Sequence, residues 1–169
     1  MELLKKIDAL LAKALKIFVF TLFSALGLLL LLRVIIRYVP LGNVIPLFAS
    51  TGWSDEIVEM LIAWTIFTTS SIIMRDNAHF RVDLIEMKVK NKAVINVLNV
   101  LIALMGVVFF GALIRYSYKL FIEATWTTSI LKISQRVPYA SIFFNSILMF
   151  LYLFRDLVVA LGKFRASKE

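Results

Sequence analysis

Cysteine is absent from the 169-residue sequence, and histidine occurs only once, at position 79. Without cysteine the chain forms no disulfides, carries out no thiol redox chemistry and binds no metal through thiolates. A single histidine cannot supply both axial ligands of a bis-histidine membrane haem. Gly-x-Ser-x-Gly, His-Glu-x-x-His and phosphate-loop patterns are also missing. These absences leave no familiar catalytic, substrate-binding, metal or cofactor site to assign, and we predict none.

Charged residues are scarce, at 18% of the sequence, whereas hydrophobic residues reach 61% and the mean hydropathy is +0.89. A soluble domain of this size is much less apolar, so the composition indicates an integral membrane protein. Four long apolar runs cover residues 17–32, 60–74, 93–114 and 137–154. We expect an all-α fold in which residues 1–169 form one compact four-helix transmembrane domain, with spans at about 14–38, 55–75, 93–118 and 137–161.

The first 16 residues have the pattern of an amphipathic helix that precedes the first span. Apolar residues recur every three or four positions, and Lys5, Lys6, Asp8 and Lys13 lie between them. Such a helix can lie in the cytoplasmic headgroup layer before the chain turns into the bilayer. A basic start is also typical of signal peptides. However, no small-residue cleavage site follows the first apolar run, where Arg33 and its neighbours lie instead, so we expect an uncleaved anchor.

The formal net charge of +8 has two interpretations. In a soluble protein it would suggest a nucleic-acid partner, whereas in a membrane protein lysine and arginine hold loops on the cytoplasmic side. Twelve of these residues lie in 1–16, 75–92 and 163–169, against six in the other two loops and the helix ends beside them. We therefore expect both termini and the middle loop in the cytoplasm, and no nucleic-acid partner.

The stretch 53–83 carries the most informative polar residues. Ser54 can cap the start of a helix, and Asp55 and Glu56 suit the positive end of the helix dipole. Only 15 uncharged residues, 60–74, lie between the last acid, Glu59, and Arg75, which is short for a span of about 20. The helix therefore has to carry Glu56, Glu59 or both to the membrane edge or into it. Because these two acids share one helix face, we expect a partner helix on that face.

Three arginines are candidate partners for these acids. Arg33 and Arg37 lie one turn apart at the far end of the first span, and Arg115 lies at the end of the third. Such side chains often extend to the membrane interface and make no specific pair. Our alternative hypothesis is that one of them pairs with Glu56 or Glu59 in the periplasmic layer.

Other polar and aromatic residues of the stretch have structural interpretations. Trp64 is most simply a packed aromatic side chain. His79 lies in a polar connector that should be at the cytoplasmic surface, where we expect it and Asp83 to shape the turn without taking part in chemistry. The candidates for structural or partner-interface roles are Arg33, Arg37, Trp53, Ser54, Asp55, Glu56, Glu59, Trp64, Arg75, His79, Asp83 and Arg115.

Three classes of function remain open at this point. An enzyme would need a base or nucleophile held by an orienting group, and His79 is the only lone candidate. A self-contained transporter would carry ionisable or helix-breaking residues near mid-span, whereas the charges and prolines here lie outside the span centres. A helper or scaffold subunit of another membrane protein fits apolar spans with charges near their ends, whose aromatic faces meet lipid or the partner.

The stretch also carries a family resemblance. The residues concerned are Trp53-Ser54-Asp55-Glu56-Ile57, Trp64, Phe67, Arg75 and His79-Phe80-Arg81-Val82-Asp83, together with Pro138-Tyr139 at the start of the last helix. With these residues the chain resembles the small membrane subunit, of DctQ or SiaQ type, of tripartite ATP-independent periplasmic (TRAP) transporters. It departs from the family pattern at Thr68-Thr69-Ser70, where glycine or alanine is usual, and at Asp55, where glutamate is more usual.

The resemblance implies a multi-pass protein of the bacterial inner membrane with both termini inside. It implies a large membrane subunit (M type) that carries substrate and sodium, and a periplasmic substrate-binding protein (P type). Family substrates are mostly organic acids such as C4-dicarboxylates and sialic acid. The small subunit would be a fixed scaffold, not an enzyme, against which the large subunit moves. The alternatives are a self-contained small transporter and, less favoured, a membrane enzyme.

Overall fold

Four α-helices make up most of the chain in the computed structural model, which describes residues 2–39, 52–76 and 92–166. They are α1 (Glu2–Tyr38), α2 (Gly52–Arg75), α4 (Lys92–Glu123) and α5 (Arg136–Ala166). Each is long and apolar enough to cross a membrane. These findings confirm the prediction of an all-helical fold with four candidate spans.

The longest helix is α1, with 37 residues and a length of about 55 Å. This length far exceeds the hydrocarbon thickness of about 30 Å. We expected the first 16 residues to form a separate helix followed by a turn, but they continue the helix of the span without a break. The reason is local, because residues 2–38 contain no proline and only one glycine, Gly27. Nothing therefore interrupts the hydrogen-bond ladder where the amphipathic pattern gives way to the apolar run.

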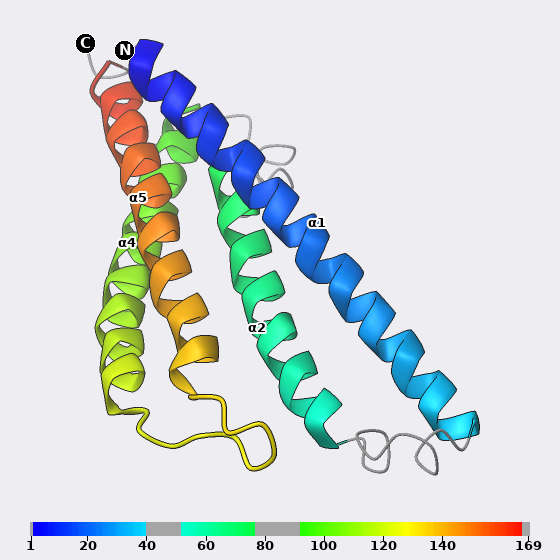
Figure 1. Ribbon diagram of the computed structural model, residues 1–169. Coiled ribbons are helices and arrows are strands. Elements are labelled where there is room, and N and C mark those ends of the chain that lie inside the picture. The colour runs from blue at the N-terminus through cyan, green and yellow to red at the C-terminus, as the bar shows by residue number, and fades with distance from the viewer. Residues whose placement is uncertain (1, 40–51, 77–91, 167–169) are drawn as a thin grey trace.

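The helices form an open row, which corrects our expectation of a compact bundle. The row has the order α1, α2, α5, α4, with α2 packed between α1 and α5, and α5 packed against α4 (Figure 1). Because lipid covers apolar side chains as well as other helices do, nothing forces such a row to close on itself. The two termini lie at one end of the row, here called the termini end. The connection between α4 and α5 lies at the other, here called the hairpin end.

A cluster of buried apolar side chains joins three of the helices. Phe110 of α4 packs with Met149, Tyr152 and Leu153 of α5, and Met74 near the end of α2 completes the cluster. The cluster therefore fixes the termini end of α2 against the α4–α5 pair.

Gly106 allows a close approach of α4 to α5. A Cβ atom at Gly106 would lie 2.9 Å from Cδ1 of the buried Leu153, whereas one at Gly111 would lie 3.8 Å from the ring of Phe150. Both substitutions by alanine gain helix propensity, but only the first must displace a packed side chain. We expect Gly106→Ala to be less stable than Gly111→Ala by about 1 kcal/mol. Equal melting temperatures of the two purified variants would contradict this expectation.

Candidate functional site

Residues 124–135 join α4 to α5 and form an ordered β-turn structure, here called the hairpin. An isolated β-bridge links Thr127 with Ser134, and the N–H of Thr128 donates to the carbonyl of Ile133 at 2.8 Å. Lys132 has a φ of 55°, in the left-handed region that residues other than glycine rarely adopt. The hairpin therefore has a defined shape that surrounding contacts must support.

One such contact comes from Arg136, the first residue of α5. Its guanidinium donates to the carbonyl of Ala124 at 3.2 Å and to that of Ile122 at 3.4 Å. The last carbonyls of a helix lack partners within the helix, so this side chain caps the end of α4. Arg136 therefore ties the start of α5 to the end of α4 and closes the base of the hairpin.

A second contact comes from Glu56 on α2. Its carboxylate accepts the backbone N–H groups of Ile130 and Leu131, each at 2.8 Å. Ionised acceptors make stronger hydrogen bonds than neutral ones, so this carboxylate is a firm anchor for the turn. The acidic start of α2 thus holds a loop that lies about 75 residues further along the chain.

We expect Glu56→Gln to loosen the hairpin and leave the helices in place. Glutamine keeps one acceptor oxygen but loses the charge that strengthens both bonds. Amide hydrogen exchange across residues 128–133 should become about tenfold faster, which corresponds to roughly 1.4 kcal/mol. The matched control is Glu123→Gln, because Glu123 forms an exposed pair with Lys119 on α4. If both variants exchange like the parent protein, Glu56 does not anchor the hairpin.

An ion pair joins α1 and α2 near the hairpin end. Both terminal nitrogens of Arg33 contact the carboxylate of Asp55, with Nη2 lying 3.2 Å from Oδ2. We expected an arginine to pair with Glu56 or Glu59, so the observed pair corrects that hypothesis. Successive helix residues point about 100° apart. Asp55 therefore faces α1 while Glu56 faces the hairpin.

The remaining charged candidates are not brought together. Glu59 on α2, Arg37 on α1 and Arg115 on α4 are all exposed. Within the described residues none of the three takes part in an ion pair. His79 and Asp83 lie outside the described residues, so the structure says nothing about the turn that they were expected to shape.

Two candidate residues at the start of α2, Ser54 and Trp53, are more buried than the exposed capping residues of a typical helix start. The helix begins at Gly52, so Ser54 lies inside its first turn and is only 2% exposed. Trp53 beside it is half-buried.

Further along α2, Trp64 donates its Nε1–H to the carbonyl of Val137 at 3.1 Å. Its ring meets Phe18 edge to face, with centroids 5.8 Å apart. Trp64 therefore links α2 to both of its neighbours in the row.

Buried polar side chains line the contact between α2 and α5 and are here called the polar seam: Thr68 and Ser71 of α2, Ser141 and Asn145 of α5. Ser71 Oγ donates to Oδ1 of Asn145 at 3.0 Å. Nδ2 of Asn145 donates to the carbonyl of Ser141 at 2.8 Å and to Oγ1 of Thr68 at 3.4 Å. Hydrogen bonds between helices hold membrane proteins together where apolar burial cannot. Our sequence interpretation considered only charges and missed this seam.

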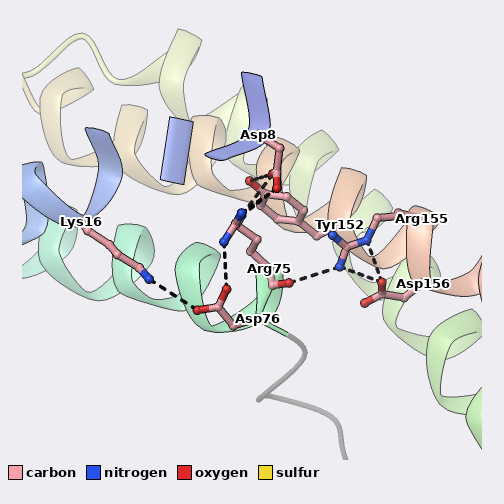
Figure 2. A network of polar contacts seen from close by, with 7 residues as sticks. All are labelled: Asp8, Lys16, Arg75, Asp76, Tyr152, Arg155 and Asp156. Carbon is pink, nitrogen blue, oxygen red and sulfur yellow. Dashed lines mark hydrogen bonds and ion pairs between the residues drawn. The ribbon is translucent and has the colours of Figure 1, made fainter. Parts of the chain in front are cut away.

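The termini end carries a network of charged side chains that joins three helices (Figure 2). Arg75 of α2 donates to the carboxylate of Asp8 on α1 through Nε, at 3.1 and 3.0 Å, and through Nη2, at 2.7 Å. The hydroxyl of Tyr152 on α5 donates to the same carboxylate at 3.4 Å. We call these three residues the ionic clamp. Because α1 crosses α2, its N-terminal part reaches α5 and the clamp can form (Figure 1).

Further ion pairs surround the clamp. Arg155 of α5 donates to the backbone carbonyl of Arg75 at 3.2 Å, near the end of α2, and pairs with Asp156 at 2.9 Å. Asp76 pairs with Arg75 at 3.0 Å and with Lys16 of α1 at 3.8 Å. Three acids thus meet three bases, and the network is balanced in charge. Of its members, only Arg75 was a candidate from the sequence.

The arrangement holds helices and the hairpin in place. Across residues 2–39, 52–76 and 92–166 there is no group of three or more His, Asp or Glu side chains placed to hold a metal ion. The charged contacts at both ends and the seam in the middle have their partners inside the chain. The Arg33–Asp55 pair, the ionic clamp and the polar seam each join two or more helices.

Comparison with known proteins gives one family. A family model described as "Tripartite ATP-independent periplasmic transporters, DctQ component" matches residues 26–162. The match covers the polar seam, the hairpin and its anchors, whereas Asp8 of the ionic clamp lies before its first residue. No curated protein matches the chain.

Proposed function

Because the chain belongs to the DctQ-component family of TRAP transporters, we propose that it is the scaffold subunit of a sodium-coupled importer of an organic acid. The observation that carries this proposal is the placement of polar groups. Every ion pair among the described residues lies near one of the two ends of the row. Between the ends, the polar seam satisfies its own hydrogen bonds. Such a row is suited to supporting a neighbouring protein, because the members of its ion pairs and of the polar seam are already engaged with one another.

The distribution of lysine and arginine sets the orientation that we propose. The termini end, with the basic segments 1–16 and 75–92, lies in the cytoplasm, and the hairpin faces the periplasm. The whole chain, residues 1–169, acts as one domain of the bacterial inner membrane. Because α1 is about 25 Å longer than the hydrocarbon layer, its first turns extend out of that layer into the cytoplasmic headgroups, with their lysines in the polar phase.

The partners that we propose follow from the family. A large membrane subunit of M type carries the organic acid and sodium, and a periplasmic binding protein of P type delivers the acid. This chain stays fixed while part of the large subunit moves. The ionic clamp and the hairpin anchors support that role, because they hold opposite ends of the same helices and so resist sliding of one helix along another.

Reconstitution into liposomes tests the proposal. We expect uptake of a C4-dicarboxylate or sialic acid only when this chain, the large subunit and the binding protein are all present with an inward sodium gradient. The chain alone should give no uptake and no turnover. Uptake by the chain alone would favour a self-contained transporter. Full uptake by the large subunit and binding protein without the chain would contradict the scaffold role.

A further inference from the structure

Glu59 differs from the other acidic side chains within the candidate membrane spans, residues 6–38, 52–75, 100–123 and 136–162. Asp8, Asp55, Glu56, Glu123 and Asp156 each have a hydrogen-bond or ion-pair partner within the chain. Glu59 is exposed on the surface of α2 and forms no such contact within the described residues. A carboxylate inside a membrane is costly unless a cation or hydrogen-bond donor meets it.

The Glu59 carboxylate lies too deep in the membrane for water at the interface to solvate its charge. Glu59 lies seven residues after the start of α2, which is about 10 Å along the helix axis. If the 24-residue helix is centred on a hydrocarbon layer of about 30 Å, the residue lies roughly 7 Å inside that layer. A glutamate side chain is too short to bring its charge fully back to the headgroups, unlike the longer side chains of lysine and arginine.

Within the described residues no lysine or arginine forms an ion pair with Glu59, and this holds for the exposed Arg37 and for Lys132 of the hairpin. Arg33, on the neighbouring helix, already pairs with Asp55. Residues 39–51, which connect α1 to α2, contain no lysine, arginine or histidine. The basic segment 77–91 leaves α2 at its opposite end, about 24 Å from Glu59. A cation of another molecule can therefore take this place.

The surroundings of Glu59 show that a helix surface of a protein fits there. Ile62 and Ile66 follow at positions three and seven further on, so they share its face of the helix. They are 40% and 56% exposed. The three side chains form a stripe, here called the Glu59 stripe, that runs from the hairpin end toward mid-span. Because α1 and α5 cover the two flanks of α2, the stripe lies on a broad face of the row (Figure 1).

We propose that the Glu59 stripe is a contact surface for the large membrane subunit, which places a lysine or arginine against Glu59 and apolar residues against Ile62 and Ile66. This inference rests on the proposed function, which supplies the partner, and adds which face of the chain the partner occupies. A lipid amine fits less well, because it lies in the headgroup layer, above the depth of Glu59. Apolar contacts below the carboxylate exclude water and strengthen the ion pair.

Co-purification of the complex tests the charge. The large subunit carries the affinity tag, and the amount of this chain that it retains in detergent is measured. We expect Glu59→Lys to reduce retention by at least about tenfold, and Glu59→Gln to reduce it less, because reversal adds repulsion to the lost attraction. Glu123→Gln is the matched control and should not change retention. The amount of each variant in the membrane and its melting temperature when isolated should equal those of the parent chain, which separates lost contact from misfolding.

A photo-crosslinking residue at position 62 or 66 tests the stripe in the intact complex. We expect covalent adducts with the large subunit at these positions, and much lower yields at Val108, an equally exposed position on α4. Equal yields at 66 and 108, adducts with lipid alone, or normal retention of Glu59→Lys would each overturn the inference. If the parent chain itself fails to co-purify with the large subunit, the proposed function fails. Normal co-purification with no effect of the variants rejects only the Glu59 stripe.

Discussion

Replacing Asp8 by asparagine is expected to release the N-terminal part of α1 from α2 and α5. Asp8 receives three contacts from Arg75, between 2.7 and 3.1 Å, and one from Tyr152. Asparagine cannot replace the charge, so Arg75 keeps only Asp76 as an acidic partner among the described residues. Breaking a fully buried pair costs several kcal/mol, but these side chains are 20% and 35% exposed. We therefore expect the free energy of unfolding to fall by about 2 kcal/mol.

The measurement combines unfolding of the purified chain with amide hydrogen exchange. Exchange should accelerate in the first turns of α1 and stay unchanged in the hairpin. Lys16→Gln is the matched control, because Lys16 makes only a 3.8 Å pair with Asp76 and both side chains are about half exposed. That pair should contribute less than about 0.5 kcal/mol. Exchanging the two charges, as Asp8→Arg with Arg75→Asp, should restore part of the loss. Equal effects of Asp8→Asn and Lys16→Gln would refute the ionic clamp.

An aspartate in place of Asn145 is expected to separate α2 from α5. The amide group of Asn145 both donates and accepts in the polar seam, whereas a carboxylate only accepts. The new oxygen would face the carbonyl of Ser141, which is itself an acceptor. A charge at this depth of a membrane helix costs about 3 kcal/mol on insertion scales. We expect a loss of that order in stability and little folded protein after purification.

A milder variant isolates the contribution of the hydrogen bonds. Asn145→Ala removes the interhelical bonds of the Asn145 side chain without adding charge and should cost about 1–2 kcal/mol. Ser146→Ala is the matched control, because Ser146 is equally buried but donates only to the carbonyl of Ile142 on its own helix. That change should cost less than about 0.5 kcal/mol. Denaturant unfolding in mixed micelles measures all three variants. If Asn145→Ala and Ser146→Ala have the same effect, the seam does not hold the two helices together.

The sequence was sufficient to predict helices, because long apolar runs have few other stable forms in a membrane. It also led to the family through the residues around Trp53, Trp64 and Arg75. The arrangement of the helices could not be predicted in the same way. Periodicity shows which residues of a helix are apolar, but lipid and protein are both apolar surroundings. The pattern therefore gave no sign that α5 lies between α2 and α4.

The contacts between side chains on different helices could be predicted from the sequence only in part. We expected Glu56 or Glu59 to pair with one of three arginines, whereas Arg33 pairs with Asp55. Which acid of α2 meets α1 depends on where each helix face points. Asp8 could have been recognised as a candidate for a contact with another helix, because it is the one acid among the lysines of residues 3–16. Asn145 is likewise the only asparagine in the last span. Polar residues that stand alone in such segments are worth treating as candidates for contacts between helices.

The place of α5 in the row has a consequence for the synthesis and membrane insertion of the protein. It is the last of the four described helices to leave the ribosome, yet it occupies an inner position, and both α2 and α4 depend on it for their main contact. Until α5 enters the bilayer, α4 has no broad contact with the pair formed by α1 and α2. A copy that stops short of α5 loses two of its three broad contacts at once.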